Sequence, residues 1–455
     1  MNPKFDVVRM ATLAVGLITI AACTRASGSL SSNTNIAATC LKNEALCNVV
    51  SGYEGNSVMS GAIGATISGG GQPGLPNQVS GNQGAIGGGN GNLAGEGSTV
   101  AGGYGNTALF FHATVGGGES NQATGEDTTV GGGLKNIASD RFSTVGGGVA
   151  NLASSLFTTV SGGSGNTASF DFAAVGGGTQ NQATSEAAVV SGGNNNLAQG
   201  AYSAILGGIN NAANNQGATV GGGAGNVATG SYAVIPGGFA NQAAGDYSFA
   251  AGREAKVAAD HPGTFLFADS NTFQFPSMAP NEFAVRATGG VRFVTAVDPS
   301  GNSLSGVRLS PGGGSWENLS DSQAKAGITP VDGRQVLDRL MSLPISTWSY
   351  RSQDPTIRHI GPMAQDFYSA FQVGDDTHYI STVDEDGVAL AAIQELYRLV
   401  QHGPDQGPAP LQSGDFALQE QIASLKGQLT FSNGLAIAAL LAAILALWQR
   451  KKGTA

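Results

Sequence analysis

The sequence has few charged, aromatic, cysteine or histidine residues. Of its 455 residues, 11% are charged and 7% are aromatic, and there are three cysteines and five histidines. The histidines lack metal-ligand spacing, so neither a metal site nor a cofactor is predicted. Acidic residues outnumber basic ones by 31 to 21, and the net charge of −10 excludes a basic face for nucleic acid.

Glycine, in contrast, accounts for 71 residues, which excludes an ordinary close-packed globule over most of the chain. From Asn106 to Asn241, Asn recurs at every fifteenth position, Ala follows two residues later, and Val or Ile precedes by six. A Gly pair sits between them, and each glycine would cost about 1 kcal/mol in a helix. The fixed period therefore predicts a parallel β-solenoid of about eleven rungs, each rising about 4.8 Å.

Each column of the repeat has an expected role. Val, Ile and Ala point inward, the Gly pair takes a tight corner, and the Asn amides bond along the stack. Because the inward side chains are small, each rung buries little apolar area, which favours association of several chains. One further column either packs between chains or across a thin core, or binds a ligand; it contains Phe142, Phe157, Phe172, Tyr202 and Tyr232, with His112 in the same register.

The repeat carries the signature Thr-Val-Gly-Gly-Gly-x-x-Asn-x-Ala, as at residues 114–123. Over roughly residues 60–255 it resembles the left-handed β-roll head of trimeric autotransporter adhesins. The resemblance implies a left-handed β-roll and a homotrimer. Since such heads bind many things, a host-surface or glycan ligand is an open alternative rather than an assignment.

Both ends of the chain predict a membrane association. Residues 1–23 have the basic start and short apolar stretch of an export signal. They end at Cys23 in a sequence that resembles a lipoprotein cleavage box, so Cys23 is predicted to be lipidated; an ordinary signal with a chance cysteine is the alternative. In an exported chain, Cys40 and Cys47 are plausible disulfide partners.

At the other end, residues 431–449 are apolar and uncharged, and three basic residues follow. We predict a single transmembrane helix with its basic flank on the cytoplasmic side, the alternative being a buried hydrophobic helix. Just before it, apolar residues spaced 4-3-4 over 416–430 predict a short coiled coil.

The stretch at residues 318–325, Asn-Leu-Ser-Asp-Ser-Gln-Ala-Lys, places Ser320 five residues before Lys325. Serine and lysine can perform acyl transfer without histidine, provided that burial keeps the lysine neutral. Five residues of regular helix would separate the two side chains, so Ser320 is expected just before a helix, with Lys325 one turn in. A capping box from Ser320 to Gln323 and an Asp321–Lys325 ion pair are structural alternatives.

The downstream sequence resembles a known domain. The match includes Ser320 to Lys325, the run His-Ile-Gly-Pro-Met-Ala-Gln-Asp-Phe from His359, and residues 379–396. Residues 320–400 resemble the C-terminal intramolecular chaperone of phage tailspikes and endosialidases, also found in myelin regulatory factor. The resemblance implies trimerisation, folding of the upstream β-structure, and cleavage between Leu319 and Ser320 by a Ser320–Lys325 dyad. His359 matches a position implicated in processing.

The sequence therefore predicts a mainly β, exported, membrane-anchored homotrimer of the bacterial cell envelope. Its head is adhesin-like, and its mixed α/β chaperone acts once on its own chain, as a serine endopeptidase without external substrates. A phage-like tail fibre or spike that binds a receptor or glycan, and a membrane-tethered signalling precursor, are alternatives. The predicted segments are a signal peptide (1–23), an N-terminal segment (24–59), the head (60–258), a β connector (259–319), the chaperone (320–402), a linker (403–415), a coiled coil (416–430), a transmembrane helix (431–449) and a cytoplasmic tail (450–455).

Overall fold

The computed structural model describes residues 36–39 and 47–402. The chain divides at residue 291 into two compact units, which are treated separately below. The predicted signal peptide, Cys23, Cys40, the linker, the coiled coil and the membrane segment 431–449 lie outside the described residues. Among the described helices, none is long and apolar enough to cross a bilayer.

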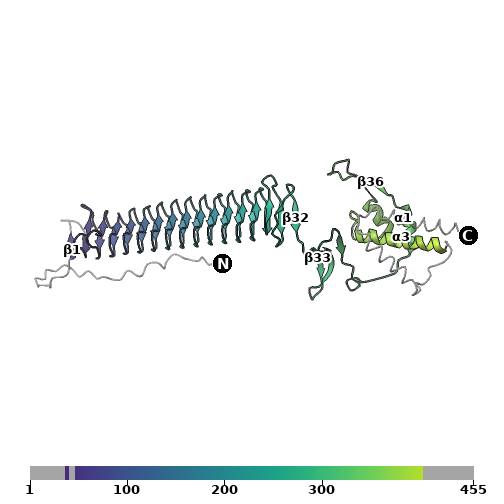
Figure 1. Cartoon of the computed structure of the whole chain (residues 1–455), viewed down its shortest axis with the longest axis horizontal. Helices are drawn as coiled ribbons and strands as arrows, with labels where there is room; N and C mark the ends of the chain where they lie inside the picture. Colours follow the sequence, from purple (N-terminus) through teal and green to yellow (C-terminus); the bar gives the residue numbers. More distant parts are fainter. Residues whose placement is uncertain (1–35, 40–46, 403–455) are drawn as a thin grey trace, which may run out of the picture. The chain divides into compact units, whose positions relative to one another are not determined.

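The first unit is a parallel β-solenoid of about 16 turns (Figure 1). Most turns add one short strand to each of two sheets. The sheet of 17 strands contains β1 (Ile36–Thr39), β2 (Asn48–Ser51), β4 (Thr66–Ile67), β6 (Ala85–Ile86), β8 (Thr99–Val100), β10 (Thr114–Val115), β12 (Thr129–Val130), β14 (Thr144–Val145), β16 (Thr159–Val160), β18 (Ala174–Val175), β20 (Val189–Val190), β22 (Ala204–Ile205), β24 (Thr219–Val220), β26 (Val234–Ile235), β28 (Phe249–Gly252), β30 (Phe265–Ala268) and β32 (Phe283–Arg286).

The second sheet has 15 strands. They are β3 (Ser57–Val58), β5 (Gln78–Val79), β7 (Leu93–Ala94), β9 (Thr107–Ala108), β11 (Gln122–Ala123), β13 (Ile137–Ala138), β15 (Leu152–Ala153), β17 (Thr167–Ala168), β19 (Gln182–Ala183), β21 (Leu197–Ala198), β23 (Ala212–Ala213), β25 (Val227–Ala228), β27 (Gln242–Ala243), β29 (Ala255–Val257) and β31 (Phe275–Pro276).

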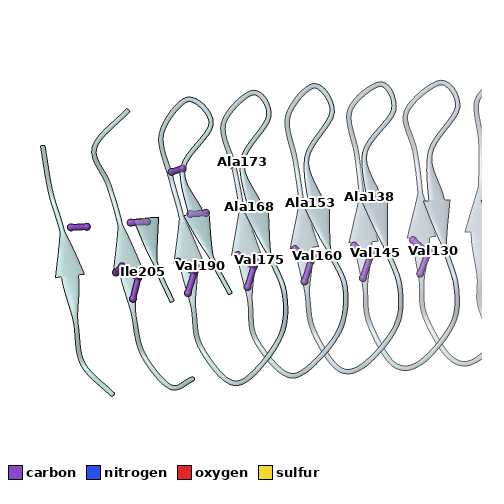
Figure 2. Close-up of a cluster of buried hydrophobic side chains, with 14 of the residues drawn as sticks. Val130, Ala138, Val145, Ala153, Val160, Ala168, Ala173, Val175, Val190 and Ile205 are labelled. Carbon is purple, nitrogen blue, oxygen red and sulfur yellow. The ribbon is translucent and has the colours of Figure 1, made fainter. Parts of the chain in front are cut away.

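The register follows the period of the sequence. Thr114 of β10 lies beside Thr129 of β12, and Gln122 of β11 lies beside Ile137 of β13, so partners are 15 residues apart. From β4 to β27, the second residue of each two-residue strand points into the core, where Val145 and Ala153 have no exposed surface. Figure 2 shows these inward Val and Ala side chains stacked turn upon turn. The predicted parallel solenoid and its inward columns are confirmed.

The Asn column forms a buried ladder. The Asn106 side-chain amide donates to the carbonyl oxygens of Gly102 and Gly118, both at 2.8 Å, and its Oδ1 accepts the backbone N–H of Asn121 at 3.0 Å. Gly118 has a φ of +88°, and a Cβ added there would meet the carbonyl oxygen of Gly133. The expected ladder is confirmed, but its bonds run mainly from amide to backbone rather than from amide to amide.

The aromatic column lies outside the core. Phe142, Phe157 and Phe172 have φ between +56° and +60°, a left-handed conformation that disfavours bulky side chains. Their rings stack, with centroids 4.7 and 5.4 Å apart, and Phe157 and Phe172 are about half exposed. Packing across a thin core is therefore excluded for this column. Contact between chains and ligand binding both remain predictions.

The solenoid extends beyond its predicted ends. β2 already pairs with β4, and β30 and β32 continue the first sheet, so turns that were assigned to the N-terminal segment and to the connector belong to the stack. Pairing in these outer turns leaves the 15-residue period, since Val49 lies beside Thr66 and Phe265 lies beside Phe283. Cys47, at the start of β2, is disulfide-bonded, as an exported chain would allow. The predicted partner Cys40 lies outside the described residues.

A polar cluster closes the C-terminal end of the solenoid. Asp269 accepts hydrogen bonds from the hydroxyl of Thr288 at 2.7 Å and from Nε of Arg286 at 2.8 Å. The guanidinium of Arg286 also donates to the carbonyl oxygens of Phe273 and Asn271. Hydrogen bonds from Thr288, and then from Asn271 and Arg286, lower the pKa of Asp269 well below its usual range.

The second unit is less compact. Its small core contains Leu343, Phe367 and Phe371, with α1 packed against α2 and α3. Two small antiparallel sheets accompany these helices. Its elements are β33 (Val291–Val297), β34 (Ser303–Leu309), β35 (Trp316–Asn318), η1 (Ser322–Ala324), α1 (Gly333–Ser342), β36 (Ser346–Trp348), β37 (His359–Gly361), α2 (Ala364–Phe371) and α3 (Thr382–His402).

Replacing one rung of the Asn ladder should loosen the stack locally. Asn166→Ala leaves the carbonyls of Gly162 and Gly178 and the N–H of Asn181 without their side-chain partner. Each orphaned buried group costs about 1–3 kcal/mol. We expect backbone amides of the adjacent turns to exchange hydrogen at least about tenfold faster by mass spectrometry. Gln182→Ala, on the exposed side of β19, is the control and should leave exchange unchanged.

The Asp269 cluster should make stability depend on pH. A depressed carboxyl pKa adds stability above the unfolded value, about 3.9, and that stability is lost as pH falls through the lower folded value. We expect Asp269→Asn to lower the urea midpoint of the solenoid at pH 6, with the gap to wild type shrinking by pH 2.5. The exposed Asp260→Asn serves as control. An equal gap at both pH values would contradict the role given to the carboxylate.

Candidate functional site

The chain before Ser320 forms the third strand of an antiparallel sheet. In this sheet, Asn318 of β35 lies opposite Val307 of β34. The pairing continues one residue further, because the N–H of Leu319 donates to the carbonyl oxygen of Gly306 at 3.1 Å. Leu319 is therefore held in an extended conformation up to the residue that carries the predicted scissile carbonyl.

A tight turn brings Ser320 and Lys325 together. Asp321 accepts the N–H of Gln323 at 2.9 Å and starts η1, a single 3₁₀ turn that ends at Lys325. The turn returns the chain so that Nζ of Lys325 lies 2.7 Å from Oγ of Ser320. The predicted proximity is present, but it comes from a 3₁₀ turn and not from a helix with Lys325 one turn in. Asp321, rather than Ser320, is the capping residue.

The Ser320 and Lys325 pair is exposed to solvent. Ser320 and Lys325 are both exposed, so none of the residues that the structure describes removes them from water. Ser320 borders a hollow of about 350 Å³, whose lining includes apolar Phe293, Val307 and Leu319 and charged Arg292, Arg308 and Glu317. A neutral lysine requires desolvation, which the described residues do not provide at this site.

The contacts described for His359 are with other residues than Ser320 and Lys325. On β37, its Nε2 lies 2.9 Å from Oε1 of Gln353, and its ring stacks against Trp348 with centroids 4.7 Å apart. Among the contacts described for His359, none is to Ser320 or Lys325. The structure thus joins two of the three predicted catalytic residues, and a role for His359 stays a prediction. Over the described ranges, no group of three or more metal-binding side chains is gathered.

Helix α3 presents an apolar stripe that none of the described residues covers. Val383, Leu390 and Tyr397 are seven residues apart, and Val400 follows; these four side chains are 43–56% exposed. The opposite face of α3 packs on α1 and buries Ala392. A seven-residue apolar spacing is typical of helices that pack against copies of themselves. This stripe was not singled out from the sequence, although its spacing is visible there.

The comparison with known families agrees with this geometry. Residues 320–373 match the family model described as chaperone of endosialidase, so the match begins at Ser320 itself. No curated protein matches the chain. The chain thus carries an endosialidase-type chaperone domain, which implies self-cleavage, behind a parallel β-solenoid. This combination indicates a tailspike-like or adhesin-like protein.

The α3 stripe predicts self-association through this helix. Leu390→Asp places a charge in the centre of the stripe and should lower the mass of the self-associated protein, as measured by light scattering of the purified protein. Met341→Asp is the matched control, because Met341 is an exposed apolar residue on α1, which packs on the other face of α3. A Leu390→Asp protein that keeps the wild-type mass would contradict an interface on this face.

Proposed function

We propose that the chain is an exported, homotrimeric, adhesin-like surface protein of the bacterial cell envelope that matures by cutting itself between Leu319 and Ser320. The chaperone domain joins three chains, sets the register of their solenoids and then separates from them. The observation that carries this proposal is the 2.7 Å contact between Lys325 and Ser320 at the first residues of the chaperone domain.

The chemistry needs only the residues of this stretch. Neutral Lys325 takes the proton of the Ser320 hydroxyl, and Oγ attacks the carbonyl carbon of Leu319. The bond from that carbon to the Ser320 nitrogen breaks, and the nitrogen takes the proton from Lys325 to become a free amine. Water then hydrolyses the ester, which leaves a carboxylate at Leu319 and restores the Ser320 hydroxyl.

Exposure of the pair supports a link between cleavage and assembly. In the described part of one chain, Lys325 is exposed to water. Contact with neighbouring copies would desolvate it, so cutting would follow correct trimer formation. Because non-local solenoid pairing is slow, a terminal domain that concentrates three chains aids folding. Its removal afterwards prevents unfolding by the same route and gives kinetic stability.

Several features support export and anchoring rather than a phage particle. They are the signal-like residues 1–23 with Cys23, the disulfide-bonded Cys47, and the apolar segment 431–449. A tail fibre or spike that binds a receptor or glycan is the second candidate, favoured by the family match. The exposed aromatic column of the head offers either protein a surface for a ligand.

Substitutions at the dyad should stop maturation. Ser320→Ala should give only the full-length chain on a blot, and Lys325→Ala should slow cutting by about 10²–10⁴-fold, the contribution of a general base. Ser322→Ala, two residues away and equally exposed, is the control. Mass spectrometry of the wild-type C-terminal fragment should find Ser320 as its first residue. A wild-type chain that stays whole in its assembled form would refute the proposal.

A further inference from the structure

The segment before Ser320 is fixed by a cross-strand ion pair as well as by backbone pairing. Arg308 of β34 lies directly opposite Glu317 of β35, and its Nε is 2.6 Å from the glutamate Oε2. The hydroxyl of Ser310 donates to the other oxygen of Glu317 at 2.9 Å. Both carboxylate oxygens of Glu317, three residues before Ser320, are therefore held, one by β34 and one by Ser310 just after it.

At Gly306, the backbone of β34 lies close to the backbone of β33. Gly306 has a φ of +151°, and a Cβ added there would meet the carbonyl oxygen of Phe293 on β33. With no side chain, Gly306 lets β33 and β34 approach while its own carbonyl accepts the N–H of Leu319. The residue that carries the scissile carbonyl is thereby bonded to the centre strand of the sheet.

We propose that Arg308 and Glu317 are positioning residues for self-cleavage, and that the sheet of β33, β34 and β35 is the platform that holds the scissile carbonyl before the Ser320 hydroxyl. This inference rests on the proposed function. Residues upstream of the chaperone domain would thus take part in the cleavage that the chaperone domain performs.

Physical reasoning favours a positioning role over a structural one. The side chains of Arg308 and Glu317 are 64% and 44% exposed, and exposed ion pairs add little to fold stability. Holding a reacting carbonyl in a near-attack geometry has a much larger effect, since small displacements slow reactions strongly. Hydrogen bonds from Arg308, and then from Ser310, lower the pKa of Glu317, so the pair stays charged through the neutral range.

The test follows cleavage of newly made full-length chain in cell-free synthesis, scored on gels within the trimeric fraction. We expect Arg308→Glu and Glu317→Arg each to slow cutting by about tenfold or more. The charge-swapped double variant should recover to within about threefold of wild type, because the two residues are coupled. Arg141→Glu is the matched control. It disrupts a solenoid ion pair with Glu126 of similar exposure and should leave the rate unchanged.

The outcomes separate the two proposals. If the single variants cut at the wild-type rate, the platform proposal is wrong and the proposed function stands. The same holds if the single variants cut slowly and the charge-swapped double variant does not recover. Single variants that fail to form trimers, with recovery of trimers in the swap, show a structural role and overturn it as well. A wild-type trimer that is never cut, like Ser320→Ala, refutes the proposed function itself.

Discussion

The hydrogen bonds of one buried amide column hold the first unit together. Each Asn side chain bonds a carbonyl in its own turn, a carbonyl in the next turn and the N–H of the following Asn, as Asn106 does with Gly102, Gly118 and Asn121. The core alone is thin, because its columns are Val, Ile and Ala. Short two-residue strands leave many corner groups unpaired, and the amides satisfy them. The glycines follow from this arrangement, since adjacent corners approach too closely for a Cβ at positions such as Gly118.

Much of this unit could be predicted from the sequence, because a regular repeat shows its geometry many times over. The period, the inward columns and the amide ladder each have a recurring residue type. The turns of β30 and β32 escaped prediction because their register partners, Phe249 with Phe265 and Phe265 with Phe283, leave the 15-residue period. For the aromatic column, the alternative of packing across a thin core was wrong. Phe157 and Phe172 resemble core residues by type, and only their backbone conformation shows that they face outward.

The site was harder to predict for a different reason. Two residues five apart meet only in particular backbone conformations, and the sequence did not distinguish a 3₁₀ turn from a regular helix. Asp321 caps the turn that brings Lys325 to Ser320. In the sequence, Ser320 itself was the capping residue considered, as an alternative to catalysis. The pairing of Leu319 with Gly306 joins strands that alternate weakly in the sequence, so it gave no signal. Resemblance, rather than periodicity, carried the prediction at this site.

The regular turns of the head are nearly interchangeable, and this has a consequence for evolution. A gene segment that encodes one or more whole repeats can be duplicated or deleted in frame, and the neighbouring turns, such as β12 and β14, would meet the same register as before. The aperiodic ends, with Asp269 and Arg286 at one of them, would be unaffected. The length of the solenoid can therefore change in discrete increments, without redesign of either end.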